Sequence, residues 1–374
     1  MSIIILAVVL ATVLGLFSDL TRKYNPLLSN VFFLLSATSL LIPLALRGMG
    51  VDYQNYILSY MDAAMRDPLE YWSAYEGRPE PLYAILNYVA FWTFGCFQGV
   101  NVLCAVLTIV PTFWAMSYFR NKVSIGLTVF AFGFSCYMLC YGLNRMMIAV
   151  AIVFSSYVAY IERKTVRYFM LVLIAGLFHY SAFIMMPMFL LLKWLEHGTS
   201  MTFFNGVKRI VGVTLAMAAI IYIFPKLTSS YSWHTRYDGY FVSRFSLSAI
   251  NNSAQFFPVF LYVLLNTKRL EKYFDTQESL VSMVHLLIML TIVGSIFSMH
   301  RLCYYLFPAG MLMYGVIPRA IKAEATGKYD KLRYGSTLAV LITLLYGGIW
   351  LARPYYTVDT LWMPYLEPYV LGKF

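Results

Sequence analysis

The chain has 374 residues, of which 60% are hydrophobic and 12% are charged, and its formal net charge is +11. Soluble domains carry about 25% charged residues, so this composition excludes an ordinary soluble protein and favours an integral membrane protein. The positive charge does not indicate nucleic-acid binding, because the Lys and Arg residues lie in short connections between apolar runs, where they determine membrane topology.

Apolar segments recur along the whole chain at lengths near those of membrane spans, which need about 20 largely apolar residues. We expect helices, in chain order, at residues 2–20, 29–46, 80–97, 100–118, 124–141, 146–161, 167–178, 181–195, 209–225, 254–267, 279–298, 302–318 and 334–352. The sequence therefore predicts an all-α, polytopic integral membrane protein with about 11–13 transmembrane or re-entrant helices. We expect a single transmembrane helical domain over residues 1–374 and no soluble domain.

The basic residues sort the connections between these helices into two sides. By the positive-inside rule, the connections predicted to face the cytoplasm are 21–28, 119–123, 162–167, 193–209, 268–278 and 319–333. The loops 47–79 and 226–253, the short connections 142–145 and 299–301, and the C-terminal tail 353–374 then face outward. The outward side holds mostly arginines, which are Arg47, Arg66, Arg78, Arg145, Arg236, Arg244, Arg301 and Arg353.

Two segments depart from the regular alternation of spans. Three apolar segments lie between the first two cytoplasmic connections, although an even number must cross, so we expect residues 80–97 to lie along the interface or to be re-entrant. The stretch 167–195 is too short for two full spans, which need about 40 residues. We therefore expect two short helices that meet near residues 178–181, with His179 at the floor of an outward, water-filled dent.

The outward arginines indicate an anionic ligand, because the planar guanidinium binds phosphate through two parallel hydrogen bonds and stays charged when partly dehydrated. Arg145 and Arg301 are the strongest candidates, since both abut apolar segments, where a charge is costly unless it is paired or functional. The alternative is that each arginine only reaches up to the lipid headgroups.

Three other residues are candidates for chemistry on the same side. His179 is suited to accept a proton from a sugar hydroxyl near neutral pH, and its alternative role is a hydrogen bond between helices. Asp52 is placed to pair with Arg47 or another outward arginine. Glu80, between two prolines, is either a site carboxylate or a helix cap.

Several patterns that would indicate other chemistries are absent from the sequence. It contains no Asp-x-Asp, HExxH, Walker A or GxSxG pattern, which argues against metal-dependent use of nucleotide sugars and against ATP-driven transport. The five cysteines lie in apolar stretches, and no His or carboxylate completes a metal-binding set with them. We expect neither a metal nor another cofactor.

Six short motifs occur in order along the chain. They are Arg47-Gly-x-Gly-Val-Asp52-Tyr53, Glu80-Pro81-Leu82-Tyr83, Leu143-Asn144-Arg145-Met146-Met147-Ile148-Ala149, Phe178-His179-Tyr180-Ser181-Ala182, Arg301 with Tyr304-Tyr305, and Trp362-Met363-Pro364-Tyr365. Together they resemble the EpsG family of Wzy-type exopolysaccharide and O-antigen polymerases. One departure is Met146, because a Gln often follows the family's Arg.

The resemblance implies a metal-independent glycosyltransferase in the bacterial inner membrane, with its active site facing the periplasm or exterior. Its substrate would be an oligosaccharide repeat unit on undecaprenyl pyrophosphate, polymerised into exopolysaccharide, capsule or O-antigen, with a flippase and a chain-length regulator as candidate partners. His179, Arg145 and Arg301 are then the expected catalytic residues. The expected substrate-binding residues are Arg47, Asp52, Glu80, Arg236, Arg244 and His300.

Three other functions remain open from the sequence. An O-antigen ligase or another lipid-linked glycan transferase shares the same Arg and His chemistry, although ligases usually carry a larger outward domain near the catalytic His. A flippase or secondary transporter predicts inverted repeats with paired broken helices, and the sequence shows none. A membrane O-acyltransferase also uses a His within the membrane, but its acyl donor normally arrives from the cytoplasm.

Overall fold

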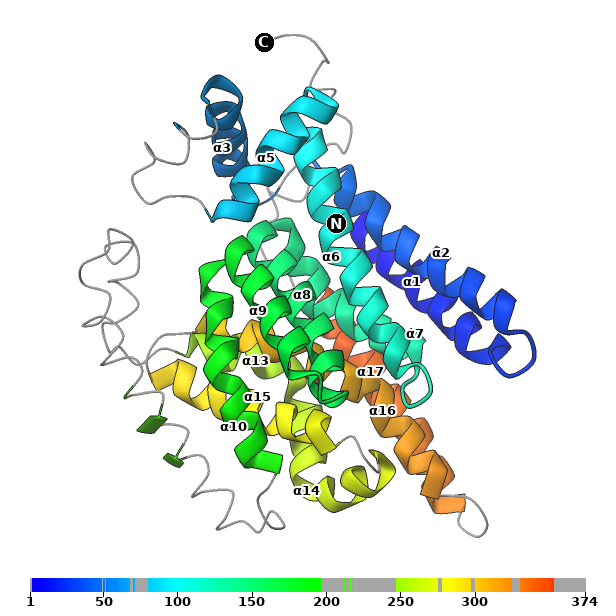
Figure 1. The fold of residues 1–374 in the computed structure, drawn as a ribbon. Helices are drawn as coiled ribbons and strands as arrows, with labels where there is room; N and C mark the ends of the chain where they lie inside the picture. The colour runs from blue at the N-terminus through cyan, green and yellow to red at the C-terminus, as the bar shows by residue number, and fades with distance from the viewer. Residues whose placement is uncertain are drawn as a thin grey trace. The chain divides into compact units, whose positions relative to one another are not determined.

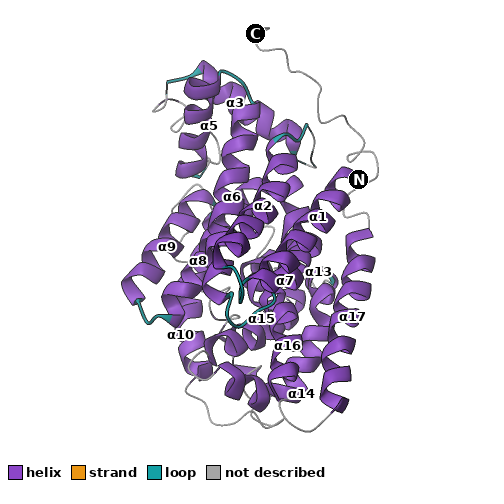
Figure 2. Ribbon diagram, turned by 90° about the vertical axis from the view of Figure 1, so that its right-hand side faces the viewer, coloured by secondary structure: helices purple, strands orange, loops and turns teal. Residues whose placement is uncertain are grey.

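The chain is helical in this computed structural model (Figure 1). The structure describes residues 2–48, 50, 52–67, 70, 80–196, 211–212, 215–216, 219, 247–274, 278–296, 300–324 and 330–352. Across these residues the backbone forms helices, turns and loops, with no strand (Figure 2). The predicted all-α class is confirmed.

The helices in the first half of the chain follow the predicted order, apart from one additional helix. Their bounds are α1 (Ser2–Thr21), α2 (Pro26–Ala45), α3 (Tyr53–Met65), α5 (Pro81–Phe94), α6 (Gln98–Phe119), α7 (Ile125–Phe132), the π-helical η1 (Gly133–Tyr137), the 3-10 helix η2 (Met138–Tyr141), α8 (Asn144–Ile161), α9 (Thr165–Phe178) and the 3-10 helix η3 (Tyr180–Ile184). Helix α3 was not predicted, because its tyrosines, amides and acidic residue make it too polar to resemble a span.

Most of the later elements also match the predicted segments, but residues 248–253 form a short helix within the predicted outward loop 226–253. They are α10 (Met185–Glu196), α13 (Ser248–Ser253), the 3-10 helix η5 (Ala254–Phe256), α14 (Phe257–Phe274), α15 (Glu278–Ile296), the 3-10 helix η6 (His300–Leu306), α16 (Phe307–Glu324) and α17 (Asp330–Ala352). Most of the predicted helix at 209–225 lies outside the described residues.

Five helices among the described residues are long and apolar enough to cross a membrane. They are Ile3–Thr21, Pro26–Ala45, Gln98–Phe119, Asn144–Ile161 and Tyr334–Ala352. Several shorter apolar helices accompany them, as expected of a multi-pass membrane protein. Helix α5 has 14 residues and a length of about 21 Å, which is less than the roughly 30 Å of the hydrocarbon core. Its predicted placement, either along the interface or as a re-entrant helix, stays a prediction.

The chain divides into two compact units. One contains Met1–Tyr75, Pro79–Ala182 and Met311–Phe374, and the other contains Glu76–Arg78 and Phe183–Gly310. The predicted single membrane domain, with its outward loops and tail, stays a prediction.

Helix α8 is the central helix of the first unit. It packs against both α6 and α9, and 89% of its residues, Asn144–Ile161, are buried. Helix α1 lies beside α2 and α7 (Figure 1). The contact with α7 is close because Gly15 meets Gly126, where an added Cβ would lie 2.9 Å from the facing Cα, and small residues allow helices in membranes to approach in this way.

Candidate functional site

One buried carboxylate joins two of the predicted catalytic residues. Glu80 Oε2 accepts a hydrogen bond from Arg145 Nη1 at 2.6 Å, and Glu80 Oε1 lies 2.9 Å from His179 Nδ1. The Glu80 side chain is 1% exposed, whereas those of Arg145 and His179 are 24% and 13% exposed. We call Glu80, Arg145 and His179 the triad; its arginine and histidine remain partly accessible while its carboxylate is enclosed.

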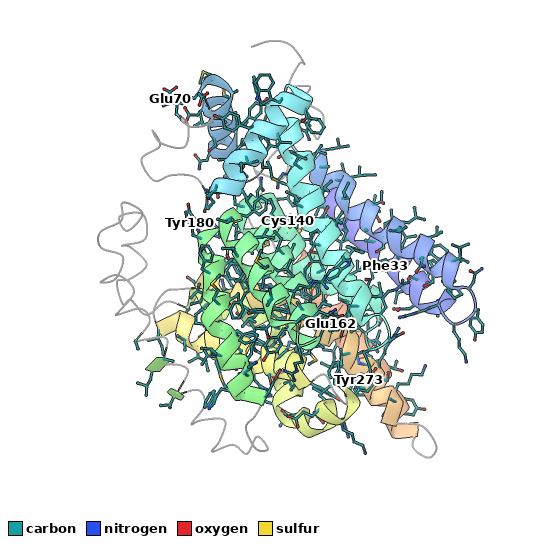
Figure 3. All side chains as sticks on the ribbon, viewed as in Figure 1. Phe33, Glu70, Cys140, Glu162, Tyr180 and Tyr273 are labelled. Carbon is teal, nitrogen blue, oxygen red and sulfur yellow. The ribbon has the colours of Figure 1, made fainter. Side chains whose placement is uncertain are left out.

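Each member of the triad lies at a helix end. Glu80 immediately precedes α5, whose first residue is Pro81, and proline favours the first position of a helix. Arg145 is the second residue of α8, where a cation opposes the helix dipole, so the Glu80 carboxylate offsets an unfavourable charge. His179 has extended backbone angles (φ −155°, ψ 110°) directly after α9. This confirms the predicted helix break near residues 178–181, which Tyr180 marks in Figure 3.

Two tyrosine rings form cation–π contacts with the Arg145 guanidinium. Its Cζ lies 5.8 Å from the centroid of the Tyr56 ring and 5.5 Å from that of the Tyr83 ring. Such cation–π contacts are worth about 0.5–2 kcal/mol, and both rings are buried. The guanidinium is therefore fixed by an ion pair and two aromatic faces before any ligand arrives.

The electrostatics of the triad determine how protons are shared. Burial alone raises the pKa of the Glu80 carboxyl, but the hydrogen bond with His179 and the positive charge of Arg145 outweigh it and lower the pKa from 4.5 to about 2. Glu80 is therefore ionised and can only accept hydrogen bonds. His179 Nδ1 must donate in this contact, which leaves the lone pair of the neutral imidazole on Nε2.

The comparison with known proteins identifies the family. The EpsG family model matches residues 30–366. The chain belongs to the EpsG family. No curated protein and no solved structure matches the chain. The match contains all six motifs of the predicted resemblance, which is confirmed, and it associates the chain with a polysaccharide polymerase-like role.

In this EpsG-family chain, Arg47 braces the site from inside the protein. It was predicted to bind substrate, but it is 1% exposed and its Nε donates to Asn101 Oδ1 at 3.3 Å. Its Nη1 donates to the carbonyl of Cys140, a residue labelled in Figure 3. The last carbonyls of a helix lack partners within it, so Arg47 satisfies the end of η2, three residues before α8 begins. This geometry favours a positioning role over direct contact with a ligand.

Gly50 and Tyr56 support the same turn. A Cβ added at Gly50 would lie 1.8 Å from the Tyr141 carbonyl oxygen, so only glycine fits against that backbone. The Tyr56 hydroxyl donates to the Gly142 carbonyl at 3.5 Å. Arg47, Gly50 and Tyr56 thus hold the turn that leads directly into Arg145. Sequence reasoning missed this role, although the two glycines that follow Arg47 signalled a tight turn.

We expect Gly50→Ala to destabilise the protein, because the added methyl must displace the Tyr141 backbone. Overpacking of this kind costs about 1–3 kcal/mol, and the thermal unfolding midpoint of the purified protein should fall accordingly. Gly348→Ala in α17 is the matched control, since a Cβ there meets nothing within 4 Å. An unchanged midpoint for Gly50→Ala would show that the close contact of Gly50 with Tyr141 does not support the turn.

Two more polar groups near Arg145 were missed by the sequence analysis. The Tyr83 hydroxyl and the side-chain amide of Asn144 are buried and have no hydrogen-bond partner among the described residues. Buried polar groups are nearly always hydrogen-bonded to protein or water, so these groups favour water or a polar ligand beside Arg145. Both residues belong to motifs that were singled out for their charged members, Glu80 and Arg145.

The remaining predicted site residues are Asp52, Arg301, His300, Arg236 and Arg244. Asp52 is half-buried just before α3, one helical turn before Tyr56. Arg301 is exposed in η6 of the second unit, where His300 begins the same turn. Arg236 and Arg244 lie outside the described residues. Within the part of the chain that is described, no group of three or more His, Cys, Asp or Glu could hold a metal ion.

Proposed function

We propose that this protein polymerises oligosaccharide repeat units linked to undecaprenyl pyrophosphate, at the outer face of the bacterial inner membrane, as a Wzy-type glycosyltransferase. The observation that carries the proposal is the triad in an EpsG-family chain: one enclosed carboxylate, Glu80, holds both a histidine and an arginine that remain partly exposed. These are the groups needed at the two ends of a glycosyl transfer.

The histidine handles the acceptor. A hydroxyl oxygen of the incoming repeat unit attacks the anomeric carbon of the growing chain, and its proton passes to His179 Nε2. Glu80 Oε1 accepts a hydrogen bond from Nδ1–H of the same ring, with 2.9 Å between the two heavy atoms. This contact fixes the tautomer and stabilises the imidazolium that forms. Glu80 is therefore a positioning residue, and His179 is the general base.

The arginine handles the leaving group. The bond between the anomeric carbon and the pyrophosphate oxygen breaks, and its electron pair remains on the undecaprenyl pyrophosphate. A guanidinium has five N–H donors, and the Glu80 contact of Arg145 uses one nitrogen, Nη1. The remaining donors can receive the growing negative charge, and preorganised donors of this kind stabilise a transition state without a metal.

The remaining candidates complete the proposal. Arg301 is proposed as a second cation for the pyrophosphate, and sugar contacts are assigned to Asp52, Arg236, Arg244 and His300. A flippase that delivers the repeat units and a chain-length regulator are the proposed protein partners. Whether the product is exopolysaccharide, capsule or O-antigen depends on the sugars supplied.

Arg145→Lys tests this function in cells that depend on this protein for their surface polysaccharide. Lysine keeps the charge but loses the planar pair of N–H donors of the guanidinium. A charge-assisted hydrogen bond is worth about 1.5–3 kcal/mol, so glycosyl transfer should slow roughly 10- to 100-fold. Gel analysis should show loss of long chains while single repeat units still reach the surface. Arg66→Lys is the matched control, because Arg66 forms a local pair with Asp62 at 2.7 Å on α3.

Normal chain lengths in Arg145→Lys would contradict the proposal. Long chains that accumulate on the carrier lipid without being attached would point instead to a ligase, which transfers a finished glycan.

A further inference from the structure

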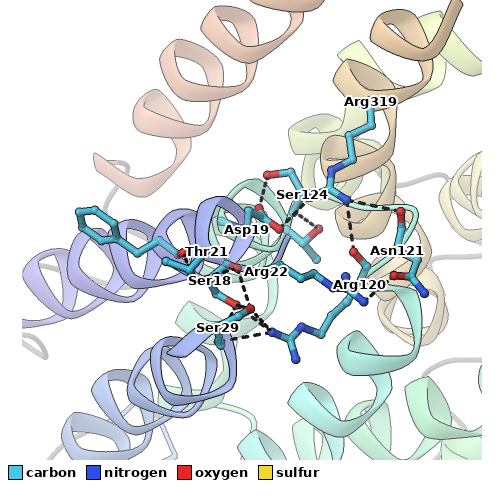
Figure 4. Close-up of polar contacts among 12 residues, drawn as sticks. Ser18, Asp19, Thr21, Arg22, Ser29, Arg120, Asn121, Ser124 and Arg319 are labelled. Carbon is cyan, nitrogen blue, oxygen red and sulfur yellow. Dashed lines mark hydrogen bonds and ion pairs between the residues drawn. The ribbon is translucent and has the colours of Figure 1, made fainter. Parts of the chain in front are cut away.

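A second cluster of charges lies in the first unit, where the α1–α2 and α6–α7 turns meet α16 (Figure 4). Three arginines gather there around a single carboxylate, and we call Arg22, Arg120, Arg319 and Asp19 the arginine cluster. Arg319 Nη2 pairs with Asp19 Oδ1 at 2.8 Å. The other carboxylate oxygen, Oδ2, accepts from the Ser124 hydroxyl at 2.8 Å. Asp19 and Arg319 therefore balance each other.

The other two arginines have neutral partners in the described residues. Arg22 Nη2 donates to Asn121 Oδ1 at 2.5 Å. Arg120 donates from Nη1 to Asn30 Oδ1 at 2.7 Å and from Nη2 to the Ser29 hydroxyl at 2.8 Å. None of these oxygens carries a formal charge, so the cluster keeps two unbalanced positive charges.

The same two arginines retain buried donors. Arg22 Nη1 and Arg120 Nε are enclosed and have no hydrogen-bond acceptor among the described residues. Leaving a buried donor unsatisfied costs about 1–3 kcal/mol, and more for a charged group. The pKa of Arg22 is lowered by burial and then by Arg319, and that of Arg120 is lowered by burial and then by Arg22. An anion would supply acceptors for these buried N–H donors and would offset the repulsion between the neighbouring arginines.

The cluster lies at the ends of two candidate membrane spans, which is where lipid headgroups are found. The candidate spans Ile3–Thr21 and Gln98–Phe119 end immediately before Arg22 and Arg120. Large apolar side chains near these ends are exposed, among them Leu20, Tyr24 and Leu27. A cationic group at the end of a span, beside exposed apolar side chains, lies at the depth of lipid phosphates.

We propose that Arg22 and Arg120 bind the phosphate of an anionic phospholipid at the ends of α1 and α6. The site is separate from the triad, and it does not depend on the polymerase function. Bound lipid would hold the α1–α2 turn to the α6–α7 turn through the two guanidinium groups.

Native mass spectrometry of the purified protein, titrated with phosphatidylglycerol or phosphatidylcholine, tests this site. Wild type should bind at least one phosphatidylglycerol in preference to phosphatidylcholine. Arg22→Gln should weaken that binding about 10-fold or more, the effect of one lost charge-assisted hydrogen bond. Lys23→Gln is the matched control, because it removes the same charge from the next, exposed residue and should bind like wild type.

Three results would overturn the proposal. The first is equal binding of both lipids by wild type, which needs no variant and so does not depend on the folding of Arg22→Gln. Lys23→Gln could lose as much affinity as Arg22→Gln, which would reduce the effect to general surface charge. Inorganic phosphate at millimolar concentration could displace the bound phosphatidylglycerol and raise the thermal unfolding midpoint as much as the lipid does. That result would make this a site for a free anion.

Discussion

Replacing Glu80 with glutamine is expected to lower polymerisation roughly 10²- to 10⁴-fold, the usual effect of disabling general acid–base catalysis. Glutamine is nearly isosteric, but it cannot balance Arg145 or stabilise a protonated His179. Removing one partner of a buried ion pair costs about 3–5 kcal/mol, and the loss here should be at the lower end because Arg145 is partly exposed. Chain-length analysis and the thermal unfolding midpoint measure the two effects.

Two comparisons separate the catalytic effect of Glu80 from its structural effect. Glu162→Gln is the matched control, since Glu162 pairs with Lys164 at 2.9 Å at the far end of α8, and it should polymerise normally. The double variant Glu80→Gln/Arg145→Gln should recover part of the lost stability, because neither charge is then left unpaired. It should not recover polymerisation. Full activity in Glu80→Gln would remove Glu80 from the site.

The pH dependence of stability follows from the lowered pKa of Glu80. A carboxyl whose pKa is depressed by folding stabilises the protein above its unfolded pKa, here near 4.5, and loses this contribution as the pH falls through its folded pKa of about 2. The part of the difference in unfolding midpoint between wild type and Glu80→Gln that comes from the ionisation of Glu80 itself should therefore not change above about pH 5. It should shrink only at lower pH.

His179→Ala is expected to abolish long polymer while the protein still inserts and binds its lipid-linked substrate. Loss of a general base costs about 10²–10⁴-fold in rate. His179→Gln separates two roles, because its amide can donate to Glu80 but cannot accept the proton of the acceptor hydroxyl. The rate of chain extension by purified protein measures both variants.

The comparison of the two His179 variants decides between proton transfer and orientation. If Gln is as inactive as Ala, His179 acts as the base. Substantial activity in Gln would mean that His179 only orients the acceptor, and normal activity in Ala would make the residue structural.

Much of the fold could be predicted because apolar length and basic connections are local properties of the sequence. The break at His179 followed from a simple length limit, since residues 167–195 cannot form two full spans. Helix α3 was missed because its burial depends on tyrosines such as Tyr56 and Tyr60 that pack on other helices. A polar, short helix gives no such local signal.

The triad could be predicted only as separate candidates. Arg145 and His179 lie 65 and 99 positions from Glu80 in the chain, and their meeting depends on how α5, α8 and α9 pack. The choice for Glu80 between a cap and a site carboxylate was likewise open, and the structure places its side chain on Arg145 and His179. The burial of Arg47 was not visible from the sequence, because its acceptors, Asn101 and the Cys140 carbonyl, come from other helices.

The most direct test is polymerisation by the purified protein in liposomes, with a defined repeat unit on undecaprenyl pyrophosphate and a metal chelator present. We predict that wild type forms a ladder of chains without any nucleotide, and that Glu80→Gln, Arg145→Lys and His179→Ala each form far less while remaining folded. If wild type does not extend the repeat unit, or if all three variants extend it as wild type does, the triad is not the site of polymerisation.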